Sequence, residues 1–441
     1  MSKTPTLGLL MIARDEEKNL PRSLGPLMAY VSEAVVLDTG SQDQTPQLAA
    51  SLGARVYELP WPGDFAAARN QALARMTTDY ALWLDADNSL DPASLARFQP
   101  RLDPDQRTIY LATERVIPQG ERVWQKRILP RRPEARWEGR IHEQLIHPPD
   151  FPILDSQLVI DHWGYAEPGL AKIKGERNLA LLSQTSLTEA HQAGDYYHLY
   201  QTGRTLSNLR RPEEAIPWLS LAAENPTNPA LASHSLILLA QAHQSAGRWE
   251  RARAVLTALT QKRPDYGPGH YFLGRLLAPV EPELAIAELT AALELGLNDP
   301  GWGAHEGVLG YGAAYLLGRL WVKAGDQAPK NSKGASGHPP DQSPALKYFR
   351  LASSFNPQRP EPKVELAGLL GATGDKTAAL EISRQVLVDF PGLRSALSLW
   401  KKLGGDEVDS ARVDSARMDS ARMDSARVGS VQNEAAQARG S

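Results

Sequence analysis

The chain has 441 residues, of which 42% are apolar and 22% are charged, an ordinary composition for a folded protein of two or three domains. Because cysteine is absent, disulfide scaffolds, thiolate metal sites and cysteine nucleophiles are excluded. The net charge of −3 argues against a generally basic, nucleic-acid-binding protein. Residues 7–13, the most apolar early run, are far shorter than the roughly 20 residues of a membrane span. With no signal-peptide pattern either, we expect a cytoplasmic protein.

The first 100 residues alternate short apolar runs with helical patterns. The apolar runs predict strands at residues 7–13, 34–37, 55–59 and 80–84, and the segments between them predict helices at 16–31, 45–52 and 65–76. Such alternation with short loops indicates a mostly parallel α/β sheet with helices on both faces. Shorter β-like pieces at 109–116, 123–129 and 158–161 predict a mixed extension of that sheet.

Two carboxylates follow the fourth predicted strand. Residues 83–88 read WLDADN, which places Asp85 and Asp87 at positions i and i+2. Alternate residues of an extended chain share a face, and open α/β sheets bind ligands beyond the carboxyl ends of their strands. Neighbouring carboxylates repel each other unless a cation lies beside them, and hard oxygen ligands suit Mg²⁺ or Mn²⁺. We therefore predict a divalent-cation site at this edge.

Three further polar blocks lie at ends of predicted strands or starts of helices. They are residues 11–20 (MIARDEEKNL), 35–45 (VVLDTGSQDQT) and 61–70 (WPGDFAAARN). Taken alone, the segment from Asp38 is also consistent with a turn and helix cap, and Arg69 with a surface ion pair. In order with the two aspartates, the blocks resemble glycosyltransferase family 2, in the branch with C-terminal tetratricopeptide (TPR) repeats. The resemblance covers roughly residues 5–180.

This resemblance implies a GT-A fold that binds a UDP- or GDP-linked sugar together with Mg²⁺ or Mn²⁺ and inverts the anomeric centre by direct displacement. Asp85 would contact the nucleotide sugar, while Asp87 would hold the metal and take part in catalysis. The substrate-binding residues that the resemblance and its motifs imply are Arg14, Glu16, Asp38, Asp64, Arg69, Asp85, Ala86 and His142. The metal ligands would be Asp85, Asp87 and His162.

A candidate catalytic base lies in residues 136–145 (RWEGRIHEQL), which resemble the family's second acidic block. There Glu143 would deprotonate the acceptor, and His162 fits the place of a later histidine near the metal. A surface or salt-bridged carboxylate is the alternative for Glu143, and a hydrogen-bonded core histidine is the alternative for His162. His142 could take either role.

From about residue 172 the sequence becomes helical and repetitive. In three segments an alanine lies twelve residues before a proline: Ala252 and Pro264, Ala345 and Pro357, Ala379 and Pro391. The last two pairs are 34 residues apart, which is the TPR period. Residues 328–343, rich in Lys, Gly, Ser and Pro, predict a flexible insertion in one inter-helix turn. Pentad repeats at 409–428 carry too few apolar side chains to fold.

We therefore predict a GT-A-like domain at residues 1–170, a TPR-like helical domain at 171–403 and a disordered tail at 404–441. The function expected is that of an inverting, metal-dependent hexosyltransferase. Its repeats would recruit a protein, peptide or glycan acceptor, or a separate partner. The alternative is a non-catalytic TPR scaffold whose degenerate N-terminal domain at most senses nucleotide sugars. Joint retention of Asp38, Arg69, Asp85 and Asp87 favours the enzyme.

Overall fold

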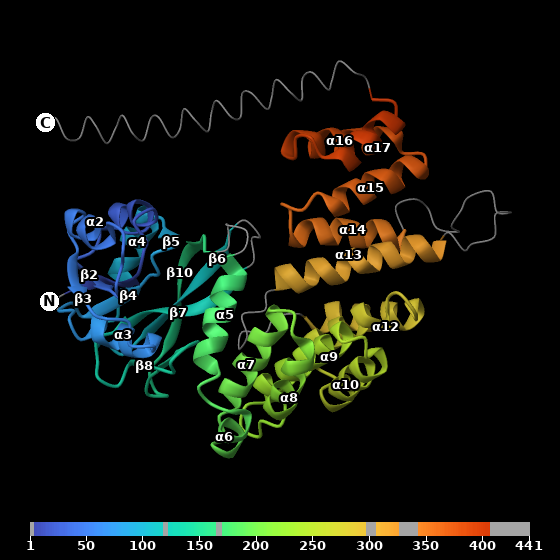
Figure 1. The fold of residues 1–441 in the computed structure, drawn as a ribbon. Coiled ribbons are helices and arrows are strands. Elements are labelled where there is room, and N and C mark those ends of the chain that lie inside the picture. Colours follow the sequence, from blue (N-terminus) through green and yellow to red (C-terminus); the bar gives the residue numbers. More distant parts are fainter. Residues whose placement is uncertain (1–3, 118–121, 165–169, 297–305, 326–342, 406–441) are drawn as a thin grey trace, which may run out of the picture. The chain divides into compact units, whose positions relative to one another are not determined.

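The computed structural model describes residues 4–117, 122–164, 170–296, 306–325 and 343–405 (Figure 1). The chain divides into two compact units, the first of which runs to Pro264 and contains the β-sheet with the helices that follow it. The second unit begins at Asp265 and contains the later helices. The predicted insertion and almost all of the predicted tail lie outside the described residues. The domain boundaries at 170 and 403 stay predictions.

An eight-stranded sheet forms the centre of the first unit, in the order β3-β2-β1-β4-β7-β6-β10-β5. Its strands are β1 (Leu7–Ala13), β2 (Glu33–Asp38), β3 (Arg55–Glu58), β4 (Tyr80–Trp83), β5 (Asn88–Leu90), β6 (Ile109–Val116), β7 (Arg122–Pro130) and β10 (Ile153–His162). The first four strands are mutually parallel, as are β6 and β10, whereas β7 runs antiparallel to β4 and β6. A second sheet pairs β8 (Arg136–Glu138) with β9 (Gln144–Ile146). The mostly parallel sheet with a mixed extension is confirmed.

Helices cover both faces of the large sheet, because successive residues of β1 pack into two different cores. Leu9 and Met11 join the core that contains α1 (Leu20–Ser23) and α4 (Pro92–Phe98). Leu10 joins the other core, with α3 (Phe65–Leu73). The two-sided burial explains why the sequence of β1 is almost continuously apolar.

The helix predicted over residues 16–31 is wrong in extent. The structure has the short α1 and then a 3₁₀ turn, η1 (Gly25–Leu27). Pro21 and Pro26 each lie in the first turn of one of these elements, the position at which a missing N–H costs least. The helix predicted at 45–52 is α2 (Thr45–Ser51). The sequence did not predict β5, α4, the 3₁₀ turn η2 (Gln99–Arg101) or the β8–β9 hairpin.

The rest of the described chain is helical, and most neighbouring helices within each unit pack together. In the first unit the helices are α5 (Leu170–Leu182), α6 (Leu187–Gln192), α7 (Tyr196–Asn208), α8 (Pro212–Ala222), α9 (Pro229–Ser245) and α10 (Trp249–Lys262). In the second unit they are α11 (Gly267–Leu277), α12 (Pro282–Leu295), α13 (Glu306–Gly325), α14 (Pro344–Phe355), α15 (Glu361–Ala372), α16 (Lys376–Asp389) and α17 (Arg394–Lys402). None of the described helices is long and apolar enough to cross a bilayer.

Small residues set the close contact within the helix pairs. The second helix of each pair buries an alanine, and these alanines are Ala215, Ala252, Ala285, Ala345 and Ala379. In the pair of α7 and α8, the first helix has a glycine where the second helix comes close. A Cβ added at Gly203 of α7 would lie 2.6 Å from Leu219 Cγ of α8. The TPR-like repeat predicted from the alanine and proline spacing is confirmed for the described helices.

Enlarging one of these alanines is expected to separate its helix pair. Ala379 has no exposed surface, and a Cβ at Gly371 of α15 would already lie 3.6 Å from Ala379 Cβ. We expect Ala379→Leu to lower the free energy of unfolding by about 1–3 kcal/mol, since the added atoms have no space without a backbone shift. Urea denaturation measures the change. The exposed Thr377→Leu is the control, at about 0.5 kcal/mol or less, and equal effects of the two variants would contradict the packing.

Candidate functional site

A cleft of about 910 Å³ lies in the first unit, where the chain leaves β1 and β4. Most of the predicted site residues line it, namely Arg14, Glu16, Arg69, Asp85, Ala86, Asp87, His142, Glu143 and His162. Asp38 and Asp64 are not among the lining residues. Parallel strands bring their carboxyl ends to one edge of a sheet, which is why residues so distant in the sequence meet here.

Asp85 is held between two guanidinium groups. Its Oδ1 lies 3.3 Å from Arg69 Nη1 and its Oδ2 lies 3.2 Å from Arg127 Nη1. The Cζ atoms of both arginines also lie over the ring of Trp83, 3.7 and 4.2 Å from its centroid. Burial alone would raise the pKa of Asp85, but the two positive charges outweigh burial and hold that pKa well below its usual range. Asp85 is therefore ionised at neutral pH.

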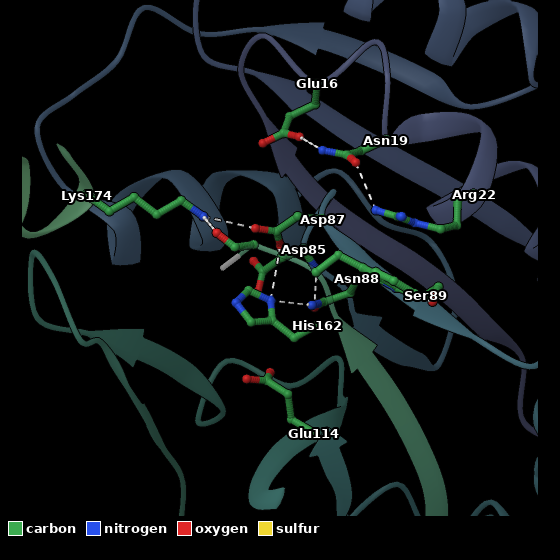
Figure 2. A network of polar contacts seen from close by, with 12 residues as sticks. Glu16, Asn19, Arg22, Asp85, Asp87, Asn88, Ser89, Glu114, His162 and Lys174 are labelled. Carbon is green, nitrogen blue, oxygen red and sulfur yellow. Dashed lines mark hydrogen bonds and ion pairs between the residues drawn. The ribbon is translucent and has the colours of Figure 1, made fainter. Parts of the chain in front are cut away.

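Asp87 lies between Lys174 and His162, as Figure 2 shows. Its Oδ2 is 3.1 Å from Lys174 Nζ and its Oδ1 is 3.4 Å from His162 Nδ1. Gly164 permits this crowding, because a Cβ there would lie 2.3 Å from Asp87 Oδ2. Burial would raise the pKa of Asp87, but the hydrogen bond to His162 helps to lower it overall. Burial likewise opposes the charged form of His162, and its contact with Asp87 outweighs burial and raises its pKa.

The pairing of β5 with β10 brings His162 to the aspartates. In this antiparallel register His162 lies opposite Asn88, whose Nδ2 is 2.9 Å from His162 Nδ1. Asn88 belongs to the same WLDADN segment as Asp85 and Asp87. β5 directly follows Asp85 and Asp87 in the sequence. Its pairing with β10 therefore places the two aspartates close to His162, the last residue of β10.

Arg69 joins the candidate base to the first aspartate. Its Nε donates to Glu143 Oε1, while Nη1 contacts Asp85. Both side chains of the Arg69–Glu143 pair are almost fully buried, at 6% and 8% exposed. Arg69 is therefore not in a surface ion pair, which was the alternative to its ligand-binding role. Glu143 is in a salt bridge, which was one of the alternatives to its role as the base. Whether Glu143 also acts as the base stays a prediction.

Glu16 and Arg14 lie at the entrance formed by the loop after β1. Glu16 accepts a hydrogen bond of 2.6 Å from Asn19 Nδ2, and burial raises its pKa. Arg14 is exposed and lies 3.7 Å from the carboxylate of Asp15. Neither side chain contacts Asp85 or Asp87 directly. A ligand that contacts both this loop and the two aspartates would therefore have to span the distance between them.

Asp38 and Asp64 act locally in this structure. Asp38 accepts hydrogen bonds from the backbone N–H groups of Gly40 and Ser41, both at 3.0 Å. Asp64 caps α3 by accepting from Ala67 N at 2.8 Å. A turn and a helix cap therefore account for the contacts that these two carboxylates make, and their roles toward a substrate stay predictions.

His142 adopts an unusual backbone conformation at the wall of the cleft. Its φ is +52°, and its Nε2 is buried without a hydrogen-bond partner among the described residues. Burial, with a smaller effect of the Arg204 charge, lowers the pKa of His142 to about 3. The imidazole is therefore neutral at pH 7.

This lowered pKa predicts a loss of stability in mild acid. The unfolded chain protonates His142 near pH 6.5, whereas the folded chain does so only near pH 3, so between these values the unfolded state binds more protons. Falling pH therefore destabilises the fold, by about 2 kcal/mol at pH 5 from this group. His142→Asn, which suits a positive φ, should lose correspondingly less stability between pH 7 and pH 5 in urea denaturation. An unchanged loss would show that the pKa of His142 is the same in the folded and unfolded states.

The predicted metal ligands supply donors that fit a divalent cation. Asp87 and His162 offer a carboxylate oxygen and an imidazole nitrogen side by side, with Asp85 close in sequence. The charges of both carboxylates are already balanced by protein cations, and a metal ion at Asp87 would displace the ammonium of Lys174. Within the described residues there is no cluster of three metal-ligating side chains. The metal thus stays a proposal.

Three charged residues of the cleft were not predicted from the sequence: Glu114, Arg127 and Lys174. Arg127 is 1% exposed and forms an ion pair with Glu114 on the neighbouring β6 as well as with Asp85. The sequence did carry a signal for this pair. Arg127 directly precedes the apolar residues 128–129 of one predicted strand, and Glu114 lies in the predicted strand beside it. Lys174 in α5 lies outside every recognised block, and only the tertiary structure brings it to Asp87.

A mostly parallel sheet with an antiparallel extension, and a cleft at the carboxyl ends of its strands, defines a GT-A-like domain. Residues 9–155 match the sequence model described as glycosyl transferase family 2.

Two curated proteins illustrate the likeness. A TPR repeat-containing protein of Synechococcus elongatus is 37% identical over 139 residues, which cover 31% of this chain and 34% of that protein. The SPbeta prophage-derived glycosyltransferase SunS of Bacillus subtilis is 26% identical over 247 residues, which cover 51% of this chain and 54% of that protein. The chain thus spans about a third to a half of these relatives. Among solved structures, a TPR protein with an unusual peptide-binding site, YrrB, covers 49% of the chain at a TM-score of 0.34 and 18% identity.

Proposed function

We propose that the protein is a glycosyltransferase that moves a sugar from a UDP- or GDP-linked donor to an acceptor nucleophile with inversion. The observation that carries this proposal is the convergence of Arg69, Asp85, Asp87 and Glu143 on one cleft of a glycosyltransferase family 2 domain. A degenerate domain would have no need to keep these side chains paired and gathered at a common space.

The donor binds along the carboxyl ends of β1 and β4 in this proposal. Asp85, oriented by Arg69 and Arg127, accepts hydrogen bonds from the nucleotide sugar, while Arg14 and Glu16 contact the nucleotide. Mg²⁺ or Mn²⁺, held by Asp87 and His162 with Asp85 nearby, would stabilise the departing diphosphate. Lys174, which contacts Asp87 in this structure and lines the cleft, would then supply a further positive charge for the diphosphate.

The acceptor binds on the side of Glu143. Arg69 contacts Oε1 of this carboxylate, which leaves Oε2 to take the proton from the acceptor as the new glycosidic bond forms. Direct attack from the face opposite the leaving diphosphate inverts the anomeric centre. The helical repeats recruit the acceptor, and their first helices, α5 and α7, already line the same cleft.

Thermal stability with UDP, GDP and their sugars, each with and without Mn²⁺, tests this function. A ligand at one hundred times its dissociation constant stabilises the folded state by about 2.7 kcal/mol, so one nucleotide should raise Tm measurably. Asp87→Asn should lose the part of this shift that depends on Mn²⁺ and any metal-stimulated transfer, whereas the exposed Asp105→Asn should keep both. If no nucleotide raises Tm in the wild type, the protein is a TPR scaffold with a degenerate domain.

A further inference from the structure

One stripe of α7 faces the cleft with polar side chains. Tyr197, Gln201 and Arg204 follow one another at spacings of four and three residues, which places them on one face of the helix, and all three line the cleft. The β8–β9 hairpin meets this stripe, since Gln144 Nε2 donates to the hydroxyl of Tyr197 at 2.5 Å. The stripe is thus joined to the loop that carries His142 and Glu143.

Two polar atoms beside this stripe are buried without a partner among the described residues. Gln201 is only 4% exposed, and its Nε2 bonds to Tyr197 while its Oε1 bonds to nothing described. His142 Nε2 is likewise buried and has no hydrogen-bond partner among the described residues. A buried polar atom without a hydrogen bond destabilises the fold, and a ligand that hydrogen-bonds to these atoms in the cleft would remove that cost.

The helical wall of the cleft is also positively charged. Its residues include Lys174, Arg177 and Arg204 but no aspartate or glutamate, whereas the acidic residues of the cleft all come from the sheet side. Lys174 has its partner in Asp87, but no carboxylate in the described part of the chain forms an ion pair with Arg204. Its guanidinium lies beside Tyr200 instead, with Cζ 5.7 Å from the ring centroid and a side-chain hydrogen bond to that residue.

The stripe lies on the acceptor side of the site. His142 directly precedes Glu143, and Gln144, which directly follows Glu143, donates to the Tyr197 hydroxyl. The donor residues follow β1 and β4 and so come from the sheet, whereas the stripe comes from α7. An anionic group bound at Arg204 would therefore belong to the molecule whose nucleophile reaches Glu143.

We propose that Tyr197, Gln201 and Arg204, together with His142, form an acceptor subsite that binds a carboxylate or phosphate group of the acceptor. Arg204 supplies the charge, the tyrosine and glutamine supply hydrogen bonds, and His142 faces the same group through Nε2. The assignment to the acceptor rests on the proposed transferase function, and the binding of the anion itself does not.

Three small probes test the subsite without requiring turnover: D-glucuronate, D-glucose 6-phosphate and neutral D-glucose, titrated by ligand-observed NMR into the full chain. At least one charged probe should bind at least tenfold more tightly than glucose, and which one does so names the anion. Arg204→Gln should weaken that probe by about 10- to 100-fold, as expected for charge-assisted hydrogen bonds. Arg204→Lys should recover part of the loss, and Arg251→Gln, at an exposed arginine of α10, should bind as the wild type does.

The outcomes separate the subsite from the proposed function. If both charged probes bind no better than glucose, or if Arg204→Gln leaves their binding unchanged, the subsite is wrong even when a nucleotide raises Tm. If a charged probe binds through Arg204 while no nucleotide raises Tm, the anion site stands and the transferase function fails. An unchanged Tm and circular dichroism spectrum of Arg204→Gln establish that the variant is folded.

Discussion

Replacing Glu143 by glutamine is expected to lower kcat by about 10²–10⁴ while nucleotide affinity stays near that of the wild type. The amide has the shape of the carboxylate and can still accept a hydrogen bond from Arg69 through its oxygen, so the geometry around Asp85 is kept. It cannot take up the acceptor proton, and this is the only property that the substitution is designed to remove. Steady-state turnover and nucleotide titration measure the two effects separately.

A second glutamate in the same hairpin provides the control. Glu138 in β8 pairs with Arg136 and is about half exposed, so Glu138→Gln should leave kcat within a small factor of the wild type. If Glu143→Gln also stays within a small factor, the base lies elsewhere. If it instead abolishes nucleotide binding, the Arg69–Glu143 pair is needed to build the donor site and has no separate role in proton transfer.

Replacing Arg127 by methionine is expected to have the largest effect on stability, lowering the free energy of unfolding by about 3–5 kcal/mol. Arg127 is 1% exposed and neutralises both Glu114 and Asp85. Methionine fills much of the same volume but leaves the nearly buried Glu114 without its ion-pair partner and Asp85 with Arg69 as its remaining ion-pair partner. Urea denaturation gives the change in the free energy of unfolding.

Arg115 on the neighbouring strand is the matched comparison. It forms two hydrogen bonds with Asp161, of 2.7 and 2.9 Å, but its side chain is 40% exposed. Arg115→Met should therefore cost about 1 kcal/mol or less. Equal effects of the two substitutions would show that burial does not distinguish these pairs. Adding Glu114→Gln to Arg127→Met should recover part of the loss, since one of the unpaired charges is then removed.

The sequence was sufficient to locate most of the cleft because its polar blocks follow strands. Once β1, β2 and β4 were recognised as parallel, Asp85, Asp87 and the residues after β1 had to share an edge of the sheet. The regular spacing of Ala345 and Ala379 predicted the helical repeats for a comparable reason, since both alanines lie at the same contact between two helices.

Contacts made by single side chains across long distances in the chain could not be predicted in this way. Lys174 meets Asp87 only because α5 packs beside the sheet, and Tyr197 meets Gln144 only because α7 reaches the β8–β9 hairpin. Local signals also misled where two prolines interrupted an otherwise helical pattern at residues 16–31. The two side-chain contacts are tertiary and left no periodic trace in the sequence, whereas the interruption at residues 16–31 is local and follows from its prolines.

Release of nucleoside diphosphate from each UDP- and GDP-sugar, in the presence of Mn²⁺, tests the central claim most directly. Wild-type protein should release one of the two diphosphates from a particular donor well above the rate of Asp87→Asn, with the rate rising when an acceptor is supplied. Release no faster than that of Asp87→Asn from every donor, in a protein that still binds a nucleotide, would contradict the claim. The N-terminal domain would then be a nucleotide-sugar sensor attached to a helical repeat.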